Sequence, residues 1–106
     1  MKRTITPHEV RDLLGSEEPL IIDVRRRADL EADPEMIPGA VWRDPQQVEM
    51  WSQQIPPDRD VVIYCVRGGS VSNSVLDLLV QKGVRARYVE GGIAAWKEAK
   101  NPVLEP

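Results

Sequence analysis

The chain has 106 residues, with 14 Lys and Arg side chains against 17 Asp and Glu, so its formal net charge is −3. A chain of this length is expected to fold as one domain over residues 1–106, and without surplus basic charge it is not expected to bind nucleic acid. No stretch approaches the roughly 20 apolar residues of a membrane helix, so no membrane partner is expected. The single cysteine, Cys65, is typical of a reducing compartment, for which the cytoplasm is the default.

Four helices and four strands are predicted from apolar runs, helical spacing and turn residues. In the first half of the chain, the prediction is a helix that begins at Pro7 and stops at Gly15, a strand at 20–24, a charged loop at 25–35 and a short strand at 41–42. A helix from 44 that ends before Pro56 and a strand at 61–65 follow. The last elements are a helix closed by Gly83, a strand at 84–89 and a helix that begins at Gly91 and Gly92.

The alternation of strands and helices predicts the arrangement of the sheet. A strand, a helix and a second strand form a crossover unit, whose two strands run parallel. We therefore predict an α/β fold with a mostly parallel central sheet and helices on both of its faces. Ligands of such sheets bind beyond the carboxyl ends of the strands. After the strand 61–65 that place is occupied by residues 66–70, and the chemistry is expected there.

Cys65 ends a strand rich in β-branched residues and is followed by a short loop and a helix. Taken alone, a cysteine in such a place is most often a small buried apolar residue. Two glycines in the loop change this interpretation, because they allow successive amide groups to turn inward as an anion-binding nest. The following helix N-terminus and Arg67 add positive potential, which favours the thiolate. The prediction is a nucleophilic Cys65 with an anion-binding loop made of Val66, Arg67, Gly68, Gly69 and Ser70.

The spacing after Cys65 disfavours a phosphatase or an arsenate reductase. Cysteine-dependent phosphatases place an arginine six positions after the cysteine, because a phosphoryl dianion needs the guanidinium as well as the amides. That position is Val71 in this chain. A smaller, singly charged anion carried on the cysteine itself fits the loop better.

Four motifs follow one another along essentially the whole chain. They are Asp-Val-Arg at 23–25, Ile-Pro-Gly-Ala at 37–40, Tyr-Cys at 64–65 with a glycine three positions after the cysteine, and Gly-Gly-Ile-Ala-Ala-Trp at 91–96. With these motifs the chain resembles a single-domain rhodanese, that is, a thiosulfate sulfurtransferase-like domain. It departs from the family pattern at Ser70, where Arg or Thr is common.

The resemblance implies a rhodanese-like three-layer domain that transfers sulfur. Cys65 would accept a sulfane sulfur from a small donor such as thiosulfate, become a persulfide, and pass the sulfur to cyanide, a thiol or a protein acceptor. The loop amides would stabilise the persulfide anion, and two half-reactions on one nucleophile would give ping-pong kinetics. No cofactor is expected. No metal is expected either, because one cysteine and one histidine do not make a usual zinc site.

Alternatives remain open from the sequence. The protein could be a catalytically weak rhodanese-like sulfur carrier, sensor or protein-binding module. Arg25 is a candidate substrate contact, or else it pairs with a carboxylate or with backbone carbonyls. The arginine run at 25–27 is interpreted as a solvated loop without a site role. Asp23 is expected to be a hydrogen-bonded structural group, His8 to be exposed, and Trp96 to face the core.

Overall fold

The computed structural model describes residues 2–16 and 19–105. Within these residues the centre is a five-stranded sheet of order β1-β5-β4-β2-β3, and every neighbouring pair of strands is parallel. The strands are β1 (Thr4–Ile5), β2 (Leu20–Asp23), β3 (Val41–Trp42), β4 (Asp60–Tyr64) and β5 (Arg85–Val89). The helices are α1 (Pro7–Ser16), α2 (Arg27–Ala32), α3 (Val48–Trp51), α4 (Ser70–Gln81) and α5 (Gly92–Glu98).

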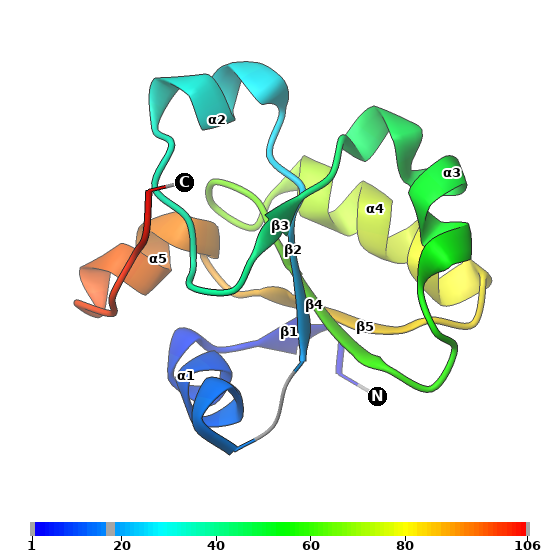
Figure 1. Ribbon diagram of the computed structural model, residues 1–106, viewed down its shortest axis with the longest axis horizontal. Helices are drawn as coiled ribbons and strands as arrows, with labels where there is room; N and C mark the ends of the chain where they lie inside the picture. The colour runs from blue at the N-terminus through cyan, green and yellow to red at the C-terminus, as the bar shows by residue number, and fades with distance from the viewer. Residues whose placement is uncertain (1, 17–18, 106) are drawn as a thin grey trace.

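Helices cover both faces of the sheet, with α1 and α5 on one side and α3 and α4 on the other (Figure 1). The two faces bury separate apolar clusters, and successive residues of β4 alternate between them. Val62 and Tyr64 belong to the cluster with Trp96 of α5, whereas Ile63 belongs to the cluster of α3 and α4. Trp96 is completely buried, as predicted. The predicted α/β fold, with a parallel sheet between two helical layers, is confirmed.

Two elements were not predicted. Strand β1 has two residues and forms by pairing with β5, where Thr4 is opposite Tyr88, so its own sequence carries no strand pattern. Helix α2 lies inside residues 25–35, which were predicted as a loop. That prediction was wrong because α2 buries none of its residues, and an unburied helix has no apolar period to reveal it.

The helix predicted from residue 44 is divided into three short pieces. The 3₁₀ turn Pro45–Gln47 precedes α3, and the 3₁₀ turn Ser52–Gln54 follows it. Asp44 caps the first piece as predicted, with its carboxylate accepting the Gln46 N–H at 2.9 Å. The Trp51 indole N–H donates to the Asp44 carbonyl at 2.8 Å, and this bond holds the pieces in a compact turn.

The first helix begins as predicted and ends one residue later than predicted. The Thr6 hydroxyl accepts the Glu9 N–H at 3.1 Å while the Glu9 carboxylate accepts the Thr6 N–H at 3.0 Å, which is a reciprocal capping box. The helix passes through Gly15 and ends at Ser16. His8 is exposed on its first turn, as expected. None of the helices in the described residues is long and apolar enough to cross a membrane.

The first prediction concerns Ser72 on the buried side of α4. Its hydroxyl is completely buried and has no hydrogen-bond partner among the described residues. An unpaired buried hydroxyl costs free energy, so Ser72→Ala is expected to raise the free energy of unfolding by about 1 kcal/mol in urea denaturation. Ser74→Ala on the exposed side of α4 is the control, because it gains the same helix propensity. A Ser72→Ala protein less stable than Ser74→Ala would contradict the prediction.

Candidate active site

Cys65 directly follows β4, at the carboxyl edge of the parallel sheet. Its side chain belongs to the apolar cluster under α3 and α4 and is 5% exposed. The residue borders a cavity of about 210 Å³. The lining comes from two segments, namely Cys65, Val66, Arg67, Gly69, Ser70 and Val71 after β4, and Arg25, Arg26 and Asp29 after β2.

The structure brings the predicted loop residues to this cavity, with one exception. Val66, Arg67, Gly69 and Ser70 line the cavity beside Cys65, whereas Gly68 does not. Gly68 has φ +72°, and a Cβ at this position would lie 3.1 Å from the Gly91 nitrogen and 3.1 Å from the Val89 oxygen. Gly68 therefore turns the loop against the chain that leads from β5 into α5.

The first turn of α5 holds the two peptide carbonyls at the start of the loop. The Ile93 N–H donates to the Cys65 carbonyl at 3.0 Å, and the Ala94 N–H donates to the Val66 carbonyl at 3.0 Å. These bonds need a close approach of the backbones, since a Cβ on Gly92 would lie 2.4 Å from the Cys65 oxygen. The sequence predicts Gly91-Gly92 only as a strand-to-helix turn, and this contact with the loop after Cys65 was not predicted.

The amide groups of the loop are left available. Across the part of the chain that is described, none of the N–H groups of residues 66–70 donates to another residue. Because a trans peptide group directs its N–H opposite to its C=O, the Val66 and Arg67 N–H groups point away from α5. Helix α4 begins at Ser70, so its first turn adds N–H groups that have no acceptor within the helix. This arrangement provides a concentration of hydrogen-bond donors beside the thiol.

Arg25 lines the cavity but most of its donors are already used. The guanidinium Nη2 lies 2.7 Å from the Asp23 carboxylate, and Nε donates to the same carboxylate at 2.9 Å. Nη1 donates to the Asp33 carbonyl at 2.8 Å, and Nη2 donates to the Glu35 carbonyl at 2.9 Å. This is the internal pairing that the sequence offered as the alternative, and a direct contact of Arg25 with substrate stays a prediction. Asp23 is the expected buried, hydrogen-bonded group.

Tyr64 lies next to the buried pair of Arg25 and Asp23. The phenol oxygen accepts the Ile37 N–H at 3.2 Å, which ties the Ile-Pro-Gly-Ala turn to β4. Burial, reinforced by the charge of Asp23, raises the pKa of Tyr64 far above its usual range, so the phenol stays neutral. Burial acts to lower the pKa of Arg25, but the hydrogen bonds and charge of Asp23 outweigh it and raise that pKa overall.

Lys97 of α5 ties down the segment that holds Arg25. Its ammonium group forms ion pairs with Asp33 and, at 2.8 Å, with Glu35. Hydrogen bonding to these two carboxylates raises the pKa of Lys97, and the hydrogen bond from Lys97 lowers the pKa of Asp33. Helix α5 therefore supports the cavity both at the Cys65 loop and, through residues 33–35, at Arg25.

The arginine run at 25–27 is not a uniform solvated loop. Arg26 lines the cavity beside Cys65, whereas the Arg27 guanidinium lies over the Trp42 ring, 5.0 Å from its centroid. Asp29 of α2 also reaches the cavity. The position of Arg26 and Asp29 at this cavity was not predicted, and the available signal was that they follow a strand next to β4 in the parallel sheet.

No group of three or more His, Cys, Asp or Glu side chains that could hold a metal ion occurs in residues 2–16 and 19–105. The chemistry that the described arrangement offers is that of a single thiol at the carboxyl edge of a parallel α/β sheet. The thiol lies beside unpaired backbone amides and arginine side chains. An arrangement of this kind suits small anionic groups next to a nucleophilic cysteine.

Comparison with known proteins identifies the family. The Rhodanese-like domain family model matches residues 6–99. The chain is 36% identical over 95 residues to a protein named sulfurtransferase from Allochromatium vinosum, which covers 89% of this chain and 86% of that protein. The chain therefore belongs to the rhodanese-like domain family, and the resemblance predicted from the four motifs is confirmed. The family and this relative support membership of a sulfurtransferase family.

Solved structures share the fold. A rhodanese-related protein from Thermoplasma volcanium superposes with a TM-score of 0.83 at 22% identity, covering 97% of this chain and 98% of that one. A rhodanese-like domain protein from Staphylococcus aureus superposes with a TM-score of 0.76 at 29% identity, covering 90% of this chain and 91% of that one.

The second prediction concerns the contact between Gly92 and the Cys65 loop. Gly92→Ala is expected to lower the free energy of unfolding by at least about 2 kcal/mol, because it adds a clash with the Cys65 carbonyl to the strain of φ +61°. Gly83→Ala is the matched control, since Gly83 has φ +80° with open space around a Cβ. Urea denaturation checks this, and equal losses in the two variants would show that the close approach carries no cost of its own.

The third prediction compares how much the buried Arg25–Asp23 ion pair and the partly exposed ion pairs of Lys97 contribute to stability. Arg25→Met leaves the Asp23 carboxylate buried without its partner and is expected to cost about 3–5 kcal/mol of unfolding free energy. Lys97→Met removes ion pairs on partly exposed side chains and is expected to cost about 1 kcal/mol or less. Chemical denaturation of both variants gives the comparison, and an Arg25→Met loss no larger than that of Lys97→Met would contradict it.

Proposed function

We propose that this protein is a sulfurtransferase that moves a sulfane sulfur from a small donor such as thiosulfate to a thiophilic acceptor through a persulfide on Cys65. The observation that carries the proposal is the position of the Cys65 thiol, which borders a cavity whose loop leaves the N–H groups of residues 66–70 without acceptors among the described residues. Family membership supports sulfur transfer as the reaction class.

The first half-reaction forms the persulfide. The Cys65 thiolate attacks the outer sulfur of thiosulfate, a bond forms between the two sulfur atoms, and the S–S bond of thiosulfate breaks. Sulfite leaves with the electron pair of that bond, and its negative charge develops beside Arg26 and Arg67. The N–H groups of the loop stabilise the persulfide anion that remains on Cys65.

The second half-reaction regenerates the thiolate. A nucleophilic acceptor attacks the outer sulfur of the persulfide, and the bond between the two sulfur atoms breaks with its electron pair returning to the Cys65 Sγ. Cyanide gives thiocyanate in this step, and a thiolate gives a new persulfide on the acceptor, which is a small molecule or a protein. A free, reduced Cys65 is needed in every cycle, which suits a reducing compartment such as the cytoplasm.

Phosphatase chemistry has less support from the same cavity. Val71 lies in its lining, at the position where a cysteine-dependent phosphatase would supply a guanidinium to a phosphoryl dianion. The site therefore offers amides and flanking arginines, but no guanidinium at that position, to an anion at Cys65.

The fourth prediction tests the persulfide. Intact-mass spectrometry after incubation with thiosulfate is expected to show a gain of one sulfur on the wild type that cyanide removes, and no gain on Cys65→Ser. The steady-state rate of thiocyanate formation is expected to fall by several orders of magnitude in Cys65→Ser, because the nucleophile is lost.

Two outcomes would oppose the proposal. Equal thiocyanate rates in the wild type and Cys65→Ser would show that Cys65 is not the nucleophile. A wild-type thiol that is alkylated by iodoacetamide but gains no sulfur from thiosulfate or from polysulfide would favour a rhodanese-like binding module. Thermal unfolding of both proteins controls for a loss of fold.

A further inference from the structure

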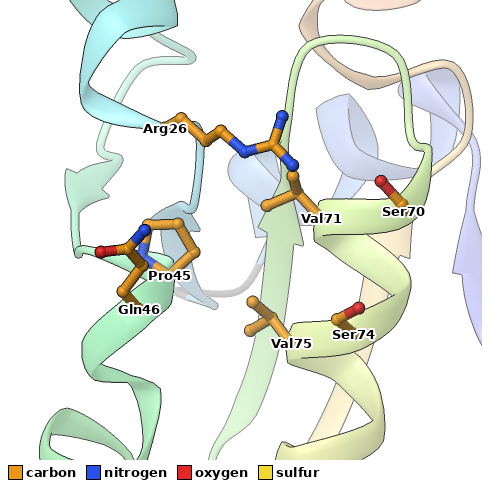
Figure 2. A pocket seen from close by; sticks show the side chains of 7 residues that line it. All are labelled: Arg26, Pro45, Gln46, Ser70, Val71, Ser74 and Val75. Atoms are coloured by element: carbon orange, nitrogen blue, oxygen red, sulfur yellow. The ribbon is translucent and has the colours of Figure 1, made fainter.

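A second cavity adjoins the one that contains Cys65. It has a volume of about 230 Å³ and shares Arg26, Ser70 and Val71 with the cavity over the thiol. Figure 2 shows the Arg26 side chain extending toward Val71, above a gap between α4 on one side and Pro45 and Gln46 on the other. The two cavities form one groove, with the thiol at one end and Arg26 at the junction.

The lining of the second cavity combines apolar and polar side chains in similar measure. Val71 and Val75 of α4 face Pro45 across it, and these side chains offer contacts to an aliphatic chain. Gln46 and Ser74 add groups that both donate and accept hydrogen bonds. Apolar surface next to groups that form hydrogen bonds suits an organic molecule that has both an aliphatic part and a polar group.

The compact substrates of the proposed reaction leave this space unexplained. Thiosulfate and cyanide are small enough to react within the cavity at Cys65. Each cavity has several times the volume that one water occupies in the liquid, about 30 Å³. The second cavity therefore suits a substrate whose reacting sulfur carries an organic tail.

The positive charge of Arg26, where the two cavities meet, determines which organic group fits the groove. Arg26 is exposed, and within the described part of the chain its guanidinium has neither an ion-pair nor a hydrogen-bond partner. It lines both cavities, and the described lining of the second cavity contains no carboxylate. Asp29 is the one acidic residue in the described lining of the first. A guanidinium with unused donors favours a carboxylate, which it binds with two parallel hydrogen bonds.

We infer that the groove binds an organic thiol bearing a carboxylate as the sulfur acceptor, with Arg26 as the residue that selects the carboxylate. This inference rests on the proposed persulfide of Cys65. The thiolate of the acceptor attacks the outer sulfur of that persulfide, a new S–S bond forms on the acceptor, and the electron pair of the broken S–S bond returns to the Cys65 Sγ. The aliphatic part of the acceptor lies against Val71 and Val75.

The test compares two thiols on persulfide-loaded protein. Mercaptohexanoate carries its thiol and its carboxylate at opposite ends of an aliphatic chain, and mercaptohexanol is its neutral counterpart with nearly the same thiol. The rate at which each removes the extra sulfur from Cys65, followed by intact-mass spectrometry, gives an acid-to-alcohol selectivity ratio. We expect the wild type to favour the acid, and Arg26→Met to lower the ratio about tenfold, the effect of one charge-assisted interaction.

Two further variants serve as controls. One tests whether the preference comes from Arg26 itself or from the overall positive charge, and the other tests whether the thiol occupies the second cavity. Arg27→Met removes the same charge from the adjacent residue, whose guanidinium lies over Trp42, and is expected to leave the ratio unchanged. Ser74→Leu places a larger side chain in the second cavity and is expected to slow discharge by both long thiols relative to discharge by cyanide.

Each outcome has a distinct meaning. Equal discharge by the acid and the alcohol in the wild type would overturn the inference while leaving the persulfide mechanism intact. An equal fall of the ratio in Arg26→Met and Arg27→Met would also overturn it, because the preference would then come from the overall field. Failure of Cys65 to take up sulfur from thiosulfate or polysulfide would overturn the proposed function itself.

Discussion

Two hydrogen bonds from the first turn of α5 to the carbonyls of Cys65 and Val66 determine the shape of the loop that follows β4. They draw two backbones together at a distance that any side chain on Gly92 would prevent. Since the carbonyls are engaged at α5, the N–H groups of the same peptides face the other way and stay available beside the thiol. The donor properties of the loop after β4 therefore depend on residues that come far later in the sequence.

The opposite wall of the cavity is supported from the same helix. Lys97 binds the side chains of Asp33 and Glu35, and the carbonyls of these two residues hold the guanidinium of Arg25. Arg25 in turn neutralises the buried carboxylate of Asp23 at the end of β2. Both segments that line the cavity are thus attached to α5, one by backbone hydrogen bonds and the other by side-chain contacts.

Sequence patterns predicted the elements whose characteristic residues lie in one continuous stretch of the sequence. The buried strand after Asp60, the helix closed by Gly83 and the capping box at Thr6 each carry their own periodicity or pairing of residues. Cys65 and the loop residues that line its cavity are contiguous in sequence as well. Strand β1 and helix α2 were missed because one exists only through pairing with β5 and the other buries nothing. The groove beside the thiol could not be predicted, since it joins α4 to residues 26 and 45–46, which meet only in the folded chain.

The sheet order has a consequence for how the protein is made. Strand β5 lies between β1 and β4, so Thr4 finds its partner Tyr88 only after most of the chain has been synthesised. Domains fold as units while they leave the ribosome, and pairings this distant in sequence form late. A nascent chain that has exposed Cys65 still lacks α5, which shapes the loop around it. The thiol is thus translated well before the cavity around it exists, and the surroundings of Cys65 are a property of the finished fold.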